Sequence, residues 1–275
     1  MALMGLLAGS ALAVAGAEIQ TVLDNSLACS HTMGISAAAS FGAALILVFG
    51  TGVISLATDI LVSVSAFIVA MFDCLLIFLL SRMKSISKGM IILIGIALMF
   101  TFNSLLGFIE YYSSADVLQA IVFWLFGNLS KASWPKLAVL AVILITIVIL
   151  FALDAWKLTA LRMGDEKAKS LGVNARRLIL KVLILTSILA SVVSSFVGII
   201  GFVGLVAPHI SRMLVGEDQR FYLFGSALSG AVILSGADIL SKVLIRGAII
   251  PIGIVTSIIG VPFFVYLIIK RKKVF

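Results

Sequence analysis

Apolar stretches of 18 or more residues recur from one end of this chain to the other. A helix rises 1.5 Å per residue, so each stretch is long enough to cross a bilayer core of about 30 Å. Lipid tails offer no hydrogen bonds to the backbone, and a segment that crosses them alone must therefore be a helix. The sequence predicts an all-α fold, a polytopic membrane helical bundle, with residues 1–275 forming a single transmembrane domain.

The composition fits a chain whose surface faces lipid. Hydrophobic residues make up 62% of the 275 residues and charged residues only 12%, and the mean hydropathy is +1.27. A soluble domain keeps roughly a quarter of its residues charged. The net charge of +8 would suggest nucleic acid in a soluble protein; here we assign it to basic loops and expect no nucleic-acid partner. Cys29 and Cys74 have neither the number nor the spacing of a disulfide framework or a metal site.

We expect about nine transmembrane helices. The region 110–131 is too polar to span and should form a loop with a short interfacial helix, which puts Trp124 and Trp134 near the lipid headgroups. The first apolar stretch lacks the basic start of a signal peptide, and its Gly and Ala content suits a tightly packed helix. The expected helices cover residues 2–22, 35–49, 54–80, 89–109, 135–156, 178–200, 202–215, 222–241 and 251–269.

The basic residues orient these helices. With the C-terminus in the cytoplasm, 16 of the 20 lysines and arginines fall in cytoplasmic loops or turns, as the positive-inside rule requires. Nine spans then put the N-terminus outside. The four basic residues on the outer side are Lys131, Lys136, Lys242 and Arg246.

The longest cytoplasmic connection, residues 157–177, mixes acidic and basic side chains. Good helix formers fill 165–171, Gly172 ends that helix, and Asn174 can cap a second one. We therefore expect two short helices at a sharp angle outside the membrane. They are either a docking surface for a soluble partner or an ordinary solvated loop.

Five segments carry a resemblance to a known family. They read LAGSALAVAGAEIQTVLDNSLA at 7–28, WLFGNLSKASW at 124–134, GDEKAKSLG at 164–172, GFVGLVAPHISRMLVG at 201–216, and a stretch at 236–268 that contains ADILSK and PIGIVTSIIGVPFF. Together they resemble the FecCD-type permease subunits of ABC importers, which take up iron-siderophores, haem or vitamin B12. The resemblance covers nearly the whole chain.

The resemblance implies a complex in the cell membrane. Two copies of the permease would form a homodimer in the lipid bilayer, and two ATP-binding cassette ATPase subunits and an extracytoplasmic substrate-binding protein would complete it. This chain contains no G-x-x-x-x-G-K-[ST] phosphate-binding loop. ATP and Mg²⁺ should therefore bind to the partner ATPase, and we expect no cofactor, metal or catalytic residue in this chain.

The resemblance also implies roles for particular residues. The segment 164–180 would be the element that couples the permease to the ATPase, with Ala168 and Leu171 as anchors on one face. Lys242 and Arg246 would meet acidic groups of the binding protein. The alternative without a docking role is that both side chains merely extend to the membrane interface. The residues of the coupling pattern are Gly164, Asp165, Glu166, Ala168, Leu171, Gly172 and Asn174. The structural family positions are Asn25, Trp124, Gly127, Gly204, Pro208, His209, Arg212, Asp238, Pro251, Gly253, Thr256, Gly260 and Pro262.

Three departures from the family pattern stand out. The family's usual first helix and a basic R-x-P-R segment have no counterpart in this sequence, which indicates a fragment, a mis-started sequence or a reduced variant. Ser26 replaces a proline, and Glu18 stands where the family is apolar. Acids inside predicted spans need a reason, and Glu18 either faces the pathway, extends to the interface or makes a structural bond. The acids in question are Glu18, Asp59, Asp73 and Asp238.

Four other functions remain open. An ion-coupled secondary transporter would use intramembrane acids and inverted repeats, and we find no clear repeat. A permease for free divalent metals should carry a His/Asp/Glu cluster at mid-membrane, and only scattered acids occur. An intramembrane enzyme should show a catalytic motif such as H-E-x-x-H. An inactive truncated copy would keep most motifs but fail to assemble.

Overall fold

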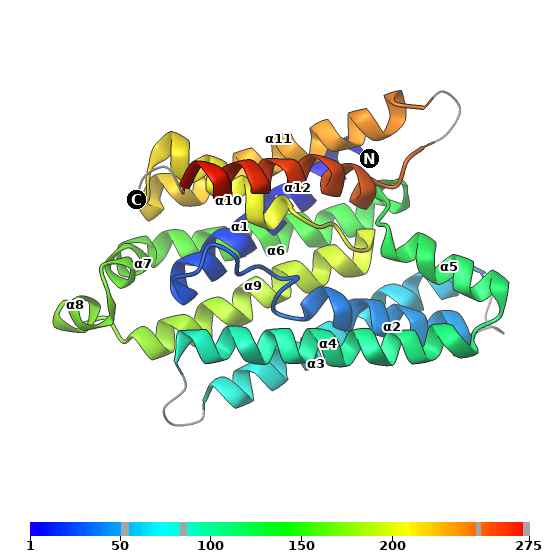
Figure 1. Cartoon of the computed structure of the whole chain (residues 1–275), viewed down its shortest axis with the longest axis horizontal. Coiled ribbons are helices and arrows are strands. Elements are labelled where there is room, and N and C mark those ends of the chain that lie inside the picture. The colour runs from blue at the N-terminus through cyan, green and yellow to red at the C-terminus, as the bar shows by residue number, and fades with distance from the viewer. Residues whose placement is uncertain (51–54, 83–86, 246–248, 272–275) are drawn as a thin grey trace.

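The computed structural model describes residues 1–50, 55–82, 87–245 and 249–271, which form an elongated helical bundle (Figure 1). The predicted all-α membrane fold is confirmed: the described part of the chain contains helices and connecting turns, and no strand. The elements are α1 (Ala2–Leu23), α2 (Ile35–Phe49), α3 (Ser55–Ser81), α4 (Lys88–Tyr112), α5 (Ala115–Leu125), η1 (Leu129–Lys131), α6 (Trp134–Leu153), α7 (Ala155–Arg162), α8 (Asp165–Ser170), α9 (Ala175–Val197), α10 (Val203–Val215), α11 (Gln219–Val243) and α12 (Ile252–Arg271).

All nine predicted spans are present as helices, but not all are long. Within the described residues, six helices are long and apolar enough to cross a membrane: α1, α3, α4, α6, α9 and α11. Of the other three expected spans, α2 and α10 are shorter apolar helices of 15 and 13 residues, and α12 has 20 residues. A helix of 15 residues, such as α2, reaches only about 22 Å. Both α2 and α10 are therefore shorter than a bilayer core of about 30 Å.

Two predicted boundaries change. The region 110–131 was expected to be a loop with one short helix; α4 extends to Tyr112, and α5 and η1 follow it. The helix expected at 135–156 ends at Leu153, and a separate short helix, α7, begins two residues later. Asp154 lies at the junction and closes α6 at its C-terminal end.

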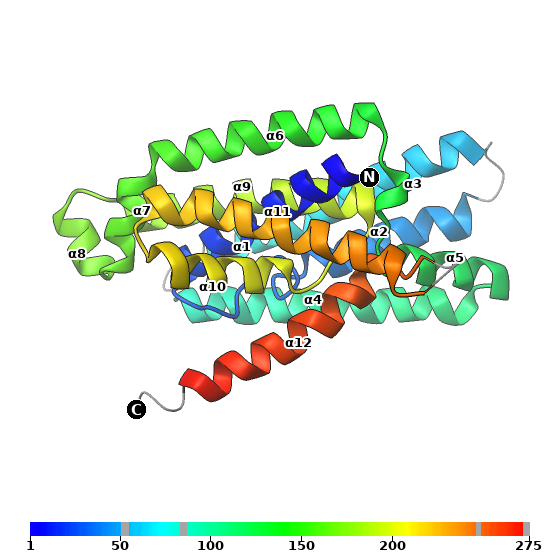
Figure 2. The ribbon, with the colours of Figure 1, turned by 90° about the horizontal axis from the view of Figure 1, so that it is seen from above.

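The helices α1 and α9 occupy the centre of the bundle, and α4 and α6 lie at its edge. In the most apolar 18-residue stretch of α1, 72% of the residues are buried, against 22% in the corresponding stretch of α6. Helix α1 packs against α9, α10 and α11. Seen from above, α6 runs along one edge, and α12 leans away from the other helices (Figure 2).

Small residues let α1 approach its neighbours closely. An ideal Cβ added to Gly9 would come within 2.2 Å of the Gly230 carbonyl oxygen on α11, and one added to Gly16 within 1.9 Å of the Gly204 carbonyl oxygen on α10. No side chain fits at either crossing. Backbone packing of this kind drives helix association in lipid, where the hydrophobic effect between helices is absent.

The two ends of the bundle differ. One end carries α7 and α8, which project beyond the other helices (Figure 1). We call this the basic end, because the charged connection between α6 and α9 lies there. The N-terminus and α5 lie at the opposite end.

A pair of glycines on α11 tests the close packing. Gly230→Ala puts a methyl group into the Gly9 backbone, whereas an added Cβ at Gly236 meets nothing within 4 Å. We expect Gly230→Ala to destabilise the protein by about 1–3 kcal/mol through overpacking. Gly236→Ala should be neutral or stabilising by about 0.5–1 kcal/mol, because it removes a flexible residue from a helix. Thermal unfolding in detergent measures both, and equal midpoints for the two variants would contradict the packing argument.

Candidate functional site

The short helix α8 is the central feature of the basic end, and two glycines delimit it. Gly164 precedes it with φ 105°, and Gly172 follows it with φ 80°. The Val173 N–H donates to the Ala168 carbonyl at 2.9 Å, and the Gly172 N–H donates to the Lys169 carbonyl at 3.0 Å. This pair of bonds is the Schellman motif, which favours glycine at its left-handed position. The predicted stop at Gly172 is confirmed.

Ala168 and Leu171, which were expected to share one outward face, differ in burial. Ala168 is completely buried, whereas Leu171 is 54% exposed. The prediction that Ala168 anchors a partner on the same face as Leu171 is therefore wrong. Ala168 packs α8 onto its own chain, because the Schellman turn folds Val173 back over it and buries both residues. Leu171 is left as an apolar side chain at the tip.

The second predicted short helix does not exist as a separate element. Asn174 does cap a helix, and its side chain accepts a hydrogen bond from the Arg177 N–H at 3.0 Å. That helix is α9, which continues as a long span to Val197. The short helix beside α8 is α7, on its other side. Asp165 adds a lateral tie, since Lys88 at the start of α4 donates to its carboxylate at 2.6 Å.

Asp154 joins α7 to α9 where the projecting segment of α7 and α8 begins. Its carboxylate receives Lys157 of α7 at 2.6 Å and Lys181 of α9 at 2.5 Å, and its side chain is 9% exposed. Burial alone would raise the pKa of Asp154, but the hydrogen bonds from the two lysines outweigh it and hold the pKa below the ordinary value of 3.8. Asp154 is not among the residues that the sequence predicted to be functional. Its spacing of three from Lys157 was the available signal, but the contact with Lys181 depends on the fold.

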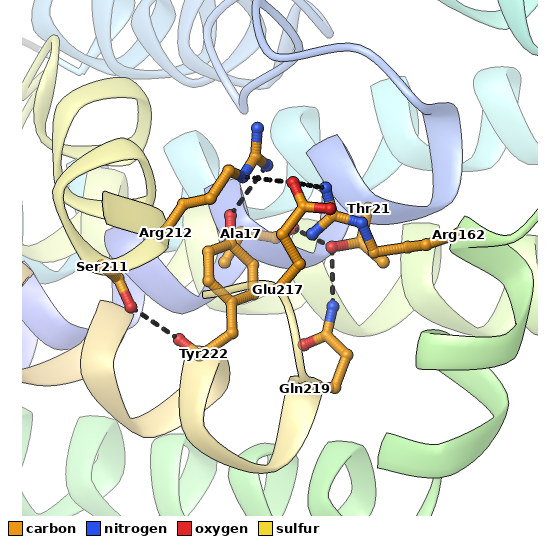
Figure 3. A network of polar contacts seen from close by, with 8 residues as sticks. All are labelled: Ala17, Thr21, Arg162, Ser211, Arg212, Glu217, Gln219 and Tyr222. Atoms are coloured by element: carbon orange, nitrogen blue, oxygen red, sulfur yellow. Dashed lines mark hydrogen bonds and ion pairs between the residues drawn. The ribbon is translucent and has the colours of Figure 1, made fainter. Parts of the chain in front are cut away.

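A polar network joins α7 to the α10–α11 turn at the same end. Glu217, in that turn, lies between the guanidinium groups of Arg162 and Arg212 (Figure 3). Arg162 donates to its carboxylate at 2.6 Å, and the Nε of Arg212 lies 3.4 Å from it. Both guanidinium carbons also lie over the ring of Tyr222, at 5.8 and 5.5 Å from its centre. Such cation–π contacts add to the ion pairs.

The network continues into the central helix. Gln219, at the start of α11, donates to the Thr21 hydroxyl of α1 at 2.7 Å, and the Gln219 N–H donates to Thr159 of α7. Tyr222 is fully buried and also receives a hydrogen bond from Arg212 at 3.2 Å. The network therefore connects α1, α7, α10 and α11. Arg212 was predicted as a structural family position, but no role was predicted for Arg162, Glu217, Gln219 and Tyr222, because only the fold brings them together.

The opposite end holds the second candidate site. Lys242 donates to Asp238 one turn earlier on α11 at 2.5 Å, and its side chain is 37% exposed. Asp238 and Lys242 line a hollow of about 430 Å³ together with Lys131, Lys136 and Asp59. Lys131 contacts Asp59 at 3.1 Å. Three of the four basic residues predicted for the outer side thus gather here, and Arg246 lies outside the described residues.

The family positions near this hollow serve close packing. Gly127 has φ 68°, and a Cβ there would meet the Ile199 carbonyl at 2.5 Å. The Gly253 N–H donates to the Phe126 carbonyl at 2.9 Å. Trp124 is 8% exposed and packs inside the bundle, whereas Trp134 is 77% exposed, and their position near the headgroups stays a prediction. Pro251 lies beside these residues and also lines the hollow.

Phe202 lies in a strained position at the start of α10. Its φ is 66°, which is unusual for a bulky residue. Gly260 of α12 accommodates its side chain, since a Cβ there would come within 2.4 Å of the Phe202 Cβ. The Thr256 hydroxyl, one turn earlier on α12, donates to the Gly253 carbonyl at 3.1 Å. The family glycine at 260 thus permits a backbone kink at 202.

The remaining predicted positions are scattered. Asn25 closes the turn after α1 by accepting from the Leu27 N–H at 2.8 Å. Pro208 is buried inside α10, and His209 beside it is half-buried. Glu166 is exposed on α8, and Pro262 is exposed on α12. Gly204 contacts α1, as described above.

Residues 1–270 match the FecCD transport family. An ABC transporter permease protein of Methanocaldococcus jannaschii is 40% identical over 275 residues, which cover 98% of this chain and 79% of that protein. The hemin transport system permease protein of Yersinia pestis is 36% identical, over 98% of this chain and 81% of its own. A solved metal-chelate type ABC transporter in an inward-facing conformation superposes with a TM-score of 0.89 at 33% identity, over 98% of this chain and 84% of that one.

The Asp154 pairs predict a pH dependence of stability. A depressed pKa in the folded state contributes stability that is present above the ordinary carboxyl range and is lost as the pH falls through the folded value. We expect Asp154→Asn to lower stability at pH 7 by about 1–2 kcal/mol, discounted because both lysines are about two-fifths exposed. The loss should shrink below about pH 4. Thermal midpoints between pH 7 and 3.5 measure this, with the exposed Asp116→Asn as control. A loss that stays constant over this range would contradict the assignment.

Proposed function

The chain belongs to the FecCD transport family of ABC importer permeases, and on that premise we propose that it imports a metal chelate, haem or a corrinoid. It would act as a homodimer in the cell membrane, with two ATPase subunits at the basic end and a substrate-binding protein at the opposite end. The observation that carries this proposal is the projecting, glycine-bounded helix α8. Segment 164–180 would then be the coupling element.

The surface of α8 is suited to a soluble partner. Leu171 presents an exposed apolar side chain at its C-terminal end, and the helix before it carries four exposed charged residues, Asp165, Glu166, Lys167 and Lys169. An apolar anchor within a polar rim is the usual composition of an interface hot spot. Gly164 and Gly172 meet nothing within 4 Å at an added Cβ, so the two ends of α8 lie open to a partner.

Movement of α8 has two routes into the bundle. Asp154 ties α7 to α9, and the Arg162–Glu217 pair ties α7 to the turn between α10 and α11. An ATPase that closes on α8 would therefore shift α9, α10 and α11 together. Alternating access in such a dimer requires a concerted shift of this kind.

The hollow at the opposite end supports docking of an acidic partner. Three lysines line it, and two of them already pair with Asp59 and Asp238. Lys242 would share its charge between Asp238 and a carboxylate of the binding protein. Exposed charges of this kind steer and orient a partner more than they tighten its binding.

The family and its relatives support the proposed class of cargo. The hemin permease and the metal-chelate transporter are similar over nearly the whole chain. Among the residues that the structure describes, no group of three His, Cys, Asp or Glu side chains could hold a metal ion. This favours an intact chelate, haem or corrinoid over a free divalent cation, which prefers such ligands.

The ATPase contact predicts a clear loss of binding. Leu171→Asp replaces the exposed apolar side chain by a charge. When the host's candidate ATPase is co-expressed with the chain, we expect the amount of ATPase that co-purifies to fall at least tenfold. The matched control is Tyr112→Asp, an exposed residue at the opposite end that is 72% accessible. It should retain the ATPase. Retention by Leu171→Asp, or equal loss with both variants, would contradict the coupling role of α8.

Docking at the opposite end should depend on salt. We expect Lys242→Ala to weaken binding of the substrate-binding protein about 3–10-fold at low ionic strength, and less at 0.5 M salt, because exposed charges are screened. Surface plasmon resonance on reconstituted nanodiscs measures this. Glu166→Ala, an exposed charge on α8, is the control. An affinity unaffected by Lys242→Ala at low salt would remove Lys242 from the docking site.

A further inference from the structure

Lys136 is a half-buried cation at the wall of the hollow of about 430 Å³. Its ammonium group lies 3.5 Å from the Lys131 carbonyl oxygen and 5.9 Å from the centre of the Phe196 ring. Among the described residues it forms no ion pair with a carboxylate, whereas the two other lysines of the hollow each pair with an aspartate. A charge that is partly withdrawn from water requires a counter-charge. Lys136 therefore has a vacant position for an anion.

The place of Lys136 in its helix adds to this requirement. Helix α6 begins at Trp134, so Lys136 lies in the first turn. The N-terminal end of a helix carries a partial positive charge, which disfavours a cation there and favours an anion. An anion beside Lys136 would be stabilised by the ammonium group first and by the end of α6 in addition.

The charges of the hollow indicate which anion fits. Three lysine and two aspartate side chains line it among the described residues, which leaves a net charge of +1. A carboxylate carries a single negative charge and matches this excess. A phosphate monoester carries about two negative charges at pH 7 and would exceed it, with two carboxylates close by. The hollow is therefore better suited to a carboxylate than to a phosphate.

The hollow also has room for the body of a ligand. Its volume of about 430 Å³ falls in the range of about 300–1,000 Å³ that is usual for small-molecule sites. Phe123 and Phe196 line it beside the charged residues, and Phe123 is 59% exposed. Such sites usually combine apolar and aromatic walls with a few charged groups. A molecule with a flat apolar body and a carboxylate arm meets both parts of the wall.

We propose that the hollow binds a carboxylate of the transported molecule and that Lys136 is its ion-pair partner. The inference rests on the proposed function and narrows the cargo to a carboxylate-bearing molecule, such as haem or a citrate chelate. Cobalamin, whose acid side chains are amides, lacks this group. Lys242 keeps its proposed role in orienting the binding protein, and Lys136 receives the cargo that this protein delivers.

The test compares two ligands that differ only in their carboxylates. Haemin carries free propionate groups, and haemin dimethyl ester has the same porphyrin body without them. Binding of each ligand to the native chain and to Lys136→Ala in nanodiscs is measured by porphyrin absorbance, with empty nanodiscs as the blank. Neither the ATPase nor the binding protein is present. Two variants serve as controls: Lys136→Arg keeps the charge, and Arg220→Ala removes a basic side chain that is 74% exposed at the start of α11.

We expect the native chain to bind haemin about tenfold more tightly than the ester, because only haemin can form the ion pair. Lys136→Ala should bind the two ligands equally, whereas Lys136→Arg and Arg220→Ala should keep the preference. Asp59→Asn should increase the preference about threefold, because it removes a negative charge from the hollow. A Lys136 that only shapes the hollow would weaken both ligands by the same factor, and that result would overturn the proposal.

Two further results would also overturn it. One is that the native chain binds haemin no better than the ester and binds ferric citrate no better than Lys136→Ala does. The other is that Lys136→Ala weakens only the substrate-binding protein, since the carboxylate then belongs to that protein. These outcomes differ from a failure of the proposed function. A chain that binds its ATPase and transports a chelate can still fail this test, and the test itself requires neither partner.

Discussion

Close backbone contact around α1 is the constraint on which the rest of the structure depends. Gly9 meets Gly230 and Gly16 meets Gly204, at distances that leave no room for a side chain. In lipid the hydrophobic effect does not hold helices together, so such contacts must supply much of the association. They place α1 at the centre and draw α10 and α11 onto it. The ends of these three helices then meet at the basic end, where the polar network forms.

The basic end is held together by ion pairs and by a helix cap. Asp154 lies at the end of α6 and joins α7 and α9 through two lysines, and the Schellman turn at Gly172 ends α8 and folds Val173 back over the buried Ala168. The base of α8 is therefore fixed to the bundle, while Leu171 at its end stays exposed.

The charged side chains are arranged differently at the two ends of the bundle. At the basic end the charges lie mainly in ion pairs between elements, such as Asp154 with Lys181 and Arg162 with Glu217. At the opposite end three lysines line one hollow of about 430 Å³, where two carboxylates partly neutralise them. Such a hollow would suit the docking proposed above, because exposed charges orient an acidic partner more than they tighten its binding.

The sequence by itself determined what depends on composition, period and local turn chemistry. The apolar stretches specified the helices, because lipid permits no other backbone arrangement. Gly172 and Asn174 specified the end of α8 and the start of α9, because a left-handed glycine and an N-cap act within a few residues. The small residues of α1 likewise indicated close packing, and the family motifs identified the family.

Only the tertiary structure decided which side chains meet. Leu171 and Ala168 are spaced as neighbours on a helix, but the turn at Gly172 buries one and exposes the other. Arg162 and Glu217 are 55 residues apart in sequence, and Gln219 and Thr21 are 198 apart. No local pattern encodes such pairs, since they depend on how whole helices cross. The same holds for Glu18, whose sequence position shows an unexpected acid, but whose complete burial follows from the packing of α1 against its neighbours.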